Sequence, residues 1–90
     1  MRNPSIHAKL VEEARVLYTL LDAADCSGLI KDPDLRKRIG ETRRRAEVTS
    51  MEQEAEAMRA LLDELERNGV IAGSWIQRRW RALMARAEKP

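Results

Sequence analysis

Apolar side chains recur every three or four residues along most of this chain, and that spacing restricts the fold more than any other feature. The first such track contains Ile6, Leu10, Ala14, Leu17, Leu21 and Ala24. Steps of three and four place side chains on one face of an α-helix. Alternating β-branched and aromatic residues, which are typical of strands, are missing. The sequence therefore predicts an all-α protein.

Residues that start or stop helices divide the chain into three segments. Pro4 and Pro33 each follow Asn or Asp, an arrangement that is typical of a helix start. Gly28 and Gly69 suit the left-handed position that ends a helix, and Ser74 can cap the last one. We expect helices at about residues 4–27, 33–67 and 74–88.

The middle segment carries two apolar tracks that are out of phase. The first track is Leu35, Ile39, Thr42 and Ala46, and the second is Val48, Met51, Ala55, Met58, Leu62 and Leu65. A break near 48–50, with Ser50 and Gln53 forming a capping box, would explain the change. The alternative is one helix whose buried face changes because its neighbour changes. It would be roughly 52 Å long at about 1.5 Å per residue, enough for the first and last helices to lie end to end along it. We favour this long central helix in an antiparallel three-helix bundle, with four helices if it breaks.

Ninety residues form one domain, over 1–90, with a thin core. A chain of this size buries only about 60% of the surface that its unfolded form exposes. Small chains often compensate with disulfides, metals or oligomerisation. Cys26 is the single cysteine and His7 the single histidine, so we expect no disulfide within the chain, no metal and no cofactor. Self-association, or docking on another protein, is the route that remains.

The sequence also gives expectations about the compartment. No apolar run approaches the roughly 18 residues that a membrane-spanning helix needs. The first ten residues contain no apolar core of a secretory signal. One unpaired cysteine fits a reducing compartment. We expect a cytoplasmic protein without membrane contact and without a small-molecule substrate.

The apolar tracks predict a protein interface. They contain more apolar side chains than we expect ninety residues to bury, so we expect a homodimer or docking on a larger protein. Buried aromatic residues and arginines are the usual anchors of interfaces. The predicted contact residues are Met58, Leu62, Trp80 and Met84, with Arg79 and Arg86 at the rim. The function that we favour is a non-catalytic interaction module, such as a bacterial or phage regulator, antiactivator, chaperone or inhibitor.

Charge is segregated along the chain. Leu35 to Arg45 contains six basic residues and one acidic residue, whereas Ala46 to Glu66 contains seven acidic residues and one basic residue. Arg67 to Pro90 is again basic. These blocks can pair within one molecule or between two antiparallel copies. Exposed pairs contribute only about 0.2–1 kcal/mol each, so they would set orientation more than stability.

The basic blocks support an alternative function, a transcriptional, plasmid or phage regulator that binds nucleic acid. The candidate phosphate contacts are Arg36, Lys37, Arg43, Arg44, Arg78 and Arg81. Such binding would weaken steeply with salt. The stretch from Glu64 to Leu83 resembles the helix–turn–helix end of winged-helix regulators, where a glycine, a Val-Ile pair and a basic helix follow an amphipathic helix. The turn is longer than the three or four residues of the usual motif, and no strand pair for a wing follows.

Overall fold

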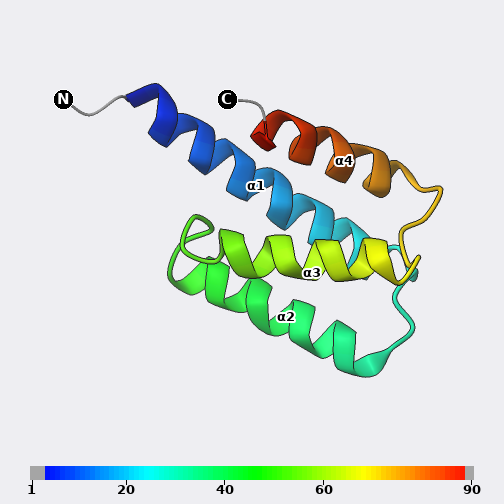
Figure 1. The fold of residues 1–90 in the computed structure, drawn as a ribbon. Coiled ribbons are helices and arrows are strands. Elements are labelled where there is room, and N and C mark those ends of the chain that lie inside the picture. The colour runs from blue at the N-terminus through cyan, green and yellow to red at the C-terminus, as the bar shows by residue number, and fades with distance from the viewer. Residues whose placement is uncertain (1–3, 89–90) are drawn as a thin grey trace.

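The computed structural model describes the backbone of residues 4–88 and the side chains of residues 9–86 (Figure 1). The described residues form four helices: α1 (Pro4–Cys26), α2 (Pro33–Val48), α3 (Ala55–Arg67) and α4 (Trp75–Glu88). The predicted all-α class is confirmed for this part of the chain, where no strand occurs. None of these helices is long and apolar enough to cross a membrane. Asn3, the predicted cap of the first helix, lies outside the described residues.

The prediction of one continuous helix over 33–67 is wrong, because the chain turns between Val48 and Ala55. The Thr49 hydroxyl donates to the Arg45 carbonyl at 2.7 Å, and the Ser50 hydroxyl accepts from the Gln53 N–H at 3.0 Å. These local bonds give the backbone an alternative to the helical pattern. The phase change between the two apolar tracks therefore marks a turn, and not a change of neighbour along one helix.

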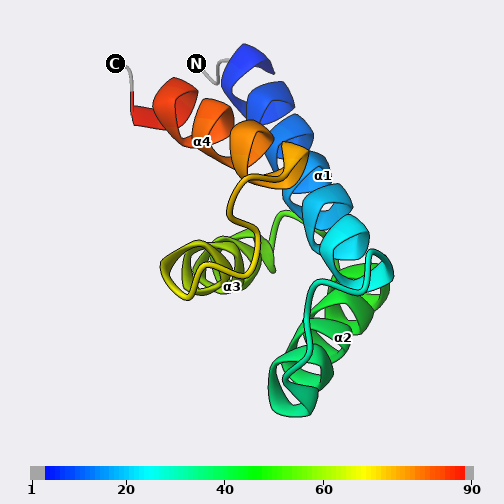
Figure 2. The same ribbon diagram turned by 90° about the vertical axis from the view of Figure 1, so that its right-hand side faces the viewer.

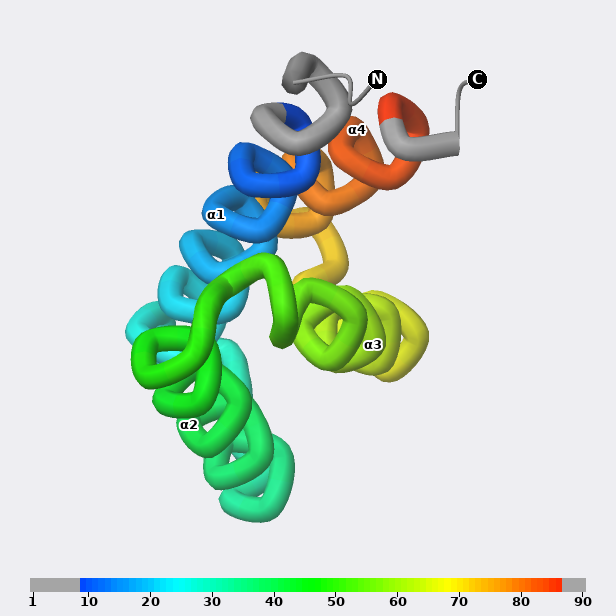
Figure 3. Tube along the Cα trace, turned by 90° about the vertical axis from the view of Figure 1, so that its left-hand side faces the viewer, coloured from blue at the N-terminus to red at the C-terminus, as the bar shows by residue number. Residues whose placement is uncertain are grey.

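The other three helices pack around α1, and each of them contacts it (Figures 1 and 2). In Figure 1 each helix runs roughly opposite to the one before it, and Figure 3 shows α1 between α2 and α4 from the other end. The Cα atoms extend over 46 × 28 × 16 Å. This flat shape leaves one face of every helix exposed to solvent.

One apolar cluster joins all four helices. Its largest fully buried side chains are Leu17, Leu20, Leu21, Ile39, Met58, Leu62, Leu65, Ile71 and Ile76. The predicted α2 track of Leu35, Ile39, Thr42 and Ala46 is buried as a whole. Most apolar side chains of the described residues are buried within the chain, so few are left for the partner that the sequence predicted. The large apolar side chains that stay exposed are Leu10, Leu29, Val48 and Trp75.

A tight link positions α4. Gly69 has φ +72°, which glycine adopts without strain, and the Val70 N–H donates to the Leu65 carbonyl at 3.0 Å to close α3. Ile71 is then fully buried and anchors the link in the core. The Ser74 hydroxyl accepts from the Gln77 N–H at 3.3 Å, as its predicted capping role requires. Trp75 therefore occupies the first position of α4.

Candidate interaction surface

Arg43, a predicted nucleic-acid contact, belongs to an ionic cluster between α1 and α2. Its guanidinium donates to the Asp25 carboxylate at 3.1 Å and also to Asp22. It lies over the Tyr18 ring, 5.5 Å from the centroid, within the reach of a cation–π contact. Burial would lower the pKa of Arg43, but its interactions with Tyr18, Asp22 and Asp25 outweigh burial and raise it. Arg43 is therefore a structural cation.

Tyr18 and Arg36 extend this cluster. The Tyr18 hydroxyl donates to the Glu47 carboxylate at 2.8 Å, and the Arg36 Nε lies 3.5 Å from the Asp25 Oδ1. The hydrogen bond to Glu47 raises the pKa of Tyr18, and burial adds to the effect. Arg36 shares the carboxylate that already holds Arg43, so both arginines join α2 to α1.

Two further arginines of α2 face α3. Arg38 forms a bidentate pair with Glu64, with both N–O distances at 3.0 Å, and this bond raises the pKa of Arg38. Arg45 pairs with Glu54 at 3.1 Å. The sequence left pairing within one molecule and pairing between two copies open. In the structure the basic block of α2 pairs within the molecule, with acids of residues 46–66 and with acids of α1.

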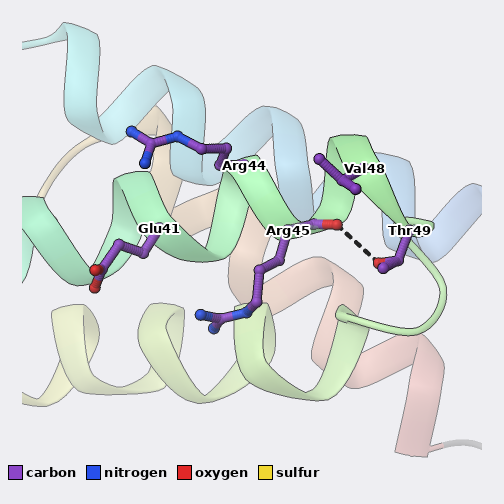
Figure 4. Close-up of a pocket in the computed structure, with 5 residues that line it drawn as sticks. All are labelled: Glu41, Arg44, Arg45, Val48 and Thr49. Atoms are coloured by element: carbon purple, nitrogen blue, oxygen red, sulfur yellow. Dashed lines mark hydrogen bonds between the residues drawn. The ribbon is translucent and has the colours of Figure 1, made fainter.

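Lys37 and Arg44 are the predicted α2 contacts that stay available. Both are exposed, and neither forms an ion pair with a described side chain. Figure 4 shows Arg44 pointing away from α3 while Arg45 points toward it, beside the shallow hollow that Val48 also lines. The predicted basic face on α2 is therefore reduced to two cations that are free to bind phosphate.

Three of the predicted interface residues, Met58, Leu62 and Trp80, lie in the chain's own core. Met58 and Leu62 are fully buried and Trp80 is 2% exposed. The Trp80 Nε1 donates to Glu66 at 3.2 Å, and Arg81 pairs with the same carboxylate at 2.7 Å. Met58 and Leu62 are covered by the packing of the helices, whereas the edge of Trp80 still lines a hollow between α3 and α4.

The other predicted α4 residues lie on the two flanks of the helix. Met84 is half-buried and lines a hollow of about 430 Å³ between α3 and α4, together with Arg59, Asp63 and Glu66. Arg78, Arg79 and Arg86 are exposed and form no ion pair with any described side chain. Arg81 differs from them because Glu66 neutralises it.

A groove between α1 and the start of α4, which we call the Trp75 groove, is the surface that the sequence did not predict. It has a volume of about 200 Å³, and it is lined by Glu12, Arg15, Val16, Thr19, Leu20, Trp75 and Arg79. Trp75 is 50% exposed, and Leu20 forms a buried apolar floor. The sequence contains Trp75 with Arg79 one helical turn later, but the α1 residues that complete the groove are brought beside them only by the fold.

Arg15 and Arg79, the two arginines of the Trp75 groove, are exposed and form no ion pair with any described side chain, including Glu12 in the same groove. The groove thus combines an exposed indole, an apolar floor and two unneutralised guanidinium groups. Within the described residues, no group of three or more His, Cys, Asp and Glu side chains is placed to hold a metal ion. Cys26 is exposed, and the side chain of His7 lies outside the described residues.

Comparison with family models, with curated proteins and with solved structures returned no match for this chain. The chemistry of the protein's own surface is therefore what indicates its function.

Proposed function

We propose that this protein is a non-catalytic interaction module, a regulator that acts by binding another protein at the Trp75 groove. The observation that carries the proposal is the half-exposed Trp75 in a groove that two arginines without an ion pair among the described side chains also line. Tryptophan and arginine are the residues most enriched among those that dominate binding energy at protein interfaces. Arg86, on the same flank of α4, extends the surface.

A non-catalytic role is supported by the state of the carboxylates. Asp22, Asp25, Glu64 and Glu66 each accept a hydrogen bond or ion pair from an arginine. General acid–base catalysis needs a carboxyl group that can reach a substrate proton. Carboxylates that arginines hold in place are suited to fixing helix positions instead.

A second copy of the chain is an alternative occupant of the groove, and a homodimer stays a prediction. Large apolar side chains on two helices, Leu10 of α1 and Trp75 of α4, are exposed. Light scattering over a range of protein concentrations would detect self-association. A dimer that Trp75→Ala dissociates would identify the second copy as the partner.

Nucleic-acid binding is the second candidate function. It is favoured by the exposed and unpaired side chains of Lys37, Arg44 and Arg78. Fluorescence anisotropy with duplex DNA at low and moderate salt would test it, because phosphate contacts make affinity fall steeply as salt rises. Failure to bind at low salt would remove this candidate.

The test of the leading proposal compares two variants that each remove one exposed apolar side chain. Trp75→Ala changes the groove, and Val48→Ala changes the side chain that is 79% exposed at the end of α2. Tagged proteins would be purified from nuclease-treated extracts of the native host. We expect a partner that the wild type and Val48→Ala retain and that Trp75→Ala loses, followed by binding of the purified partner in calorimetry. Equal recovery with all three proteins would contradict the proposal.

A further inference from the structure

We propose that the Trp75 groove binds a short acidic peptide segment that inserts one large apolar side chain beside the Trp75 indole. This inference rests on the proposed function, and it specifies the chemistry of the partner. Three features of the groove support it: its unpaired cations, the size of its apolar hollow and the acids along its α1 edge.

The cations of the groove differ from most other arginines in this protein. Arg36, Arg38, Arg43, Arg45, Arg67 and Arg81 each have a carboxylate partner within the chain. Arg15 and Arg79 have none among the described side chains, although both line the groove. A guanidinium group binds a carboxylate through two parallel hydrogen bonds. A partner that brings acidic side chains would supply the missing counter-charges.

The size of the hollow indicates one apolar side chain. Its volume is about 200 Å³, with Val16 and Leu20 on its apolar side. An apolar cavity of about 150 Å³ is large enough to hold benzene, whereas sites for drug-sized ligands occupy about 300–1,000 Å³. The groove therefore suits a single leucine-sized or phenylalanine-sized side chain, with the exposed indole of Trp75 as its contact surface.

The acids beside the groove favour a peptide over a nucleic acid. Glu12 lines the Trp75 groove, and Glu12 and Glu13 line the next hollow along α1, beside Lys9 and Arg86. A nucleic-acid strand needs a continuous basic track for its phosphates, and these carboxylates would repel it. A peptide can place its acids at Arg15 and Arg79 and avoid Glu12 and Glu13.

The experiment selects a random peptide library, displayed on phage, against the full chain. We expect the enriched peptides to be acidic around one aromatic or large aliphatic residue. Synthetic peptides would then be titrated by fluorescence anisotropy. Trp75→Ala should weaken binding by about thirtyfold or more, as for an interface anchor, and the double variant Arg15→Glu/Arg79→Glu by at least about tenfold.

The matched control is the double variant Arg44→Glu/Arg59→Glu. It makes the same change of net charge at two exposed arginines that have no ion pair among the described residues. We expect its affinity to stay within about threefold of the wild type, because the two sites lie outside the groove. Circular dichroism melts of all variants would verify that each one is folded before binding is compared.

The outcomes separate the two proposals. Enriched peptides that are neutral or basic, but still need Trp75, would overturn the acidic partner and leave the proposed function standing. A library without enrichment, or peptides that bind Trp75→Ala as well as the wild type, would overturn the proposed function too. If single-stranded DNA bound in a Trp75-dependent way and peptides did not bind, the ligand of the groove would be a nucleic acid. The proposed peptide ligand would then be wrong.

Discussion

The two sides of α1 contact their neighbours through different chemistry. Toward α2, α1 presents Asp22 and Asp25, which hold Arg43 and Arg36. Toward α4, it presents Val16 and Leu20, beside Trp75 and Arg79. In the contact between α1 and α2, the arginines and carboxylates form ion pairs with one another. The contact between α1 and α4 buries apolar surface, and Arg15 and Arg79 beside it have no ion pair with a described side chain.

This difference explains why a basic sequence block is a poor guide to a binding surface. The block on α2 is the densest in the chain, yet Arg36, Arg38, Arg43 and Arg45 are used within the protein. In α4, Arg78, Arg79 and Arg86 have no carboxylate partner among the described side chains, although Glu12 of α1 lines the same groove as Arg79. A cation is available to a partner only where folding leaves it without a carboxylate.

The largest expected effect is at the apolar contact. Trp80→Ala should lower the free energy of unfolding by about 3–5 kcal/mol, because the ring is 2% exposed and its removal leaves a cavity. That loss is a large part of the roughly 5–15 kcal/mol that stabilises a typical domain. Urea denaturation followed by circular dichroism would measure it. Trp75→Ala is the comparison and should lose less, about 1–2 kcal/mol, because half of this side chain is exposed in the folded protein. Similar losses in the two variants would show that Trp75 is also part of the core.

The ionic contact should give a smaller effect. Arg43→Ala should lower the free energy of unfolding by about 1–3 kcal/mol, because it leaves Asp22 and Asp25 without their hydrogen bonds to a charged donor. Arg38→Ala breaks a pair on the opposite side of α2 whose arginine is 54% exposed, against 21% for Arg43. That control should lose less than about 1 kcal/mol. The same denaturation experiment compares them, and equal losses would mean that the α1–α2 cluster is no stronger than a surface pair.

The sequence was sufficient for the local features of the fold. The spacing of Leu35, Ile39 and Ala46 predicted the buried face of α2, and these residues are buried. Ser74 accepts the capping hydrogen bond that its position predicted. Such features depend on neighbours within one helical turn, so a single sequence specifies them.

The long-range features needed the structure. The partners of Arg43 lie 18 and 21 residues earlier in the chain, and the partner of Arg38 lies 26 residues later. The contact between Arg38 and Glu64 depends on the turn after Val48, so the preference for a continuous helix concealed that these two charges would meet. The contacts of Arg43 depend on how α2 folds back along α1. The 50% exposure of Trp75 also depends on how α1 packs beside it.

The smallest expected effect is a shift in the titration of Tyr18, which reports on the ionic contact without a change in packing. The chain has one tyrosine, so the absorbance of tyrosinate follows this group alone. In the folded protein its pKa should lie above the ordinary value of about 10, because ionisation breaks the hydrogen bond to Glu47 and places two negative charges together. Glu47→Gln should lower the midpoint, with circular dichroism verifying that the protein is folded throughout.

The sign of the linkage follows from the same shift. A tyrosine whose pKa is raised on folding stabilises the native state at pH values below the unfolded pKa, and this contribution is lost as pH rises through the folded pKa. The wild type should therefore lose stability relative to Tyr18→Phe as pH increases above about 10. A native midpoint at or below the ordinary value would mean that Glu47 does not hold the hydroxyl in solution. The ionic cluster between α1 and α2 would then not include Glu47. The difference between the two sides of α1 would depend on the ion pairs of Asp22 and Asp25 alone.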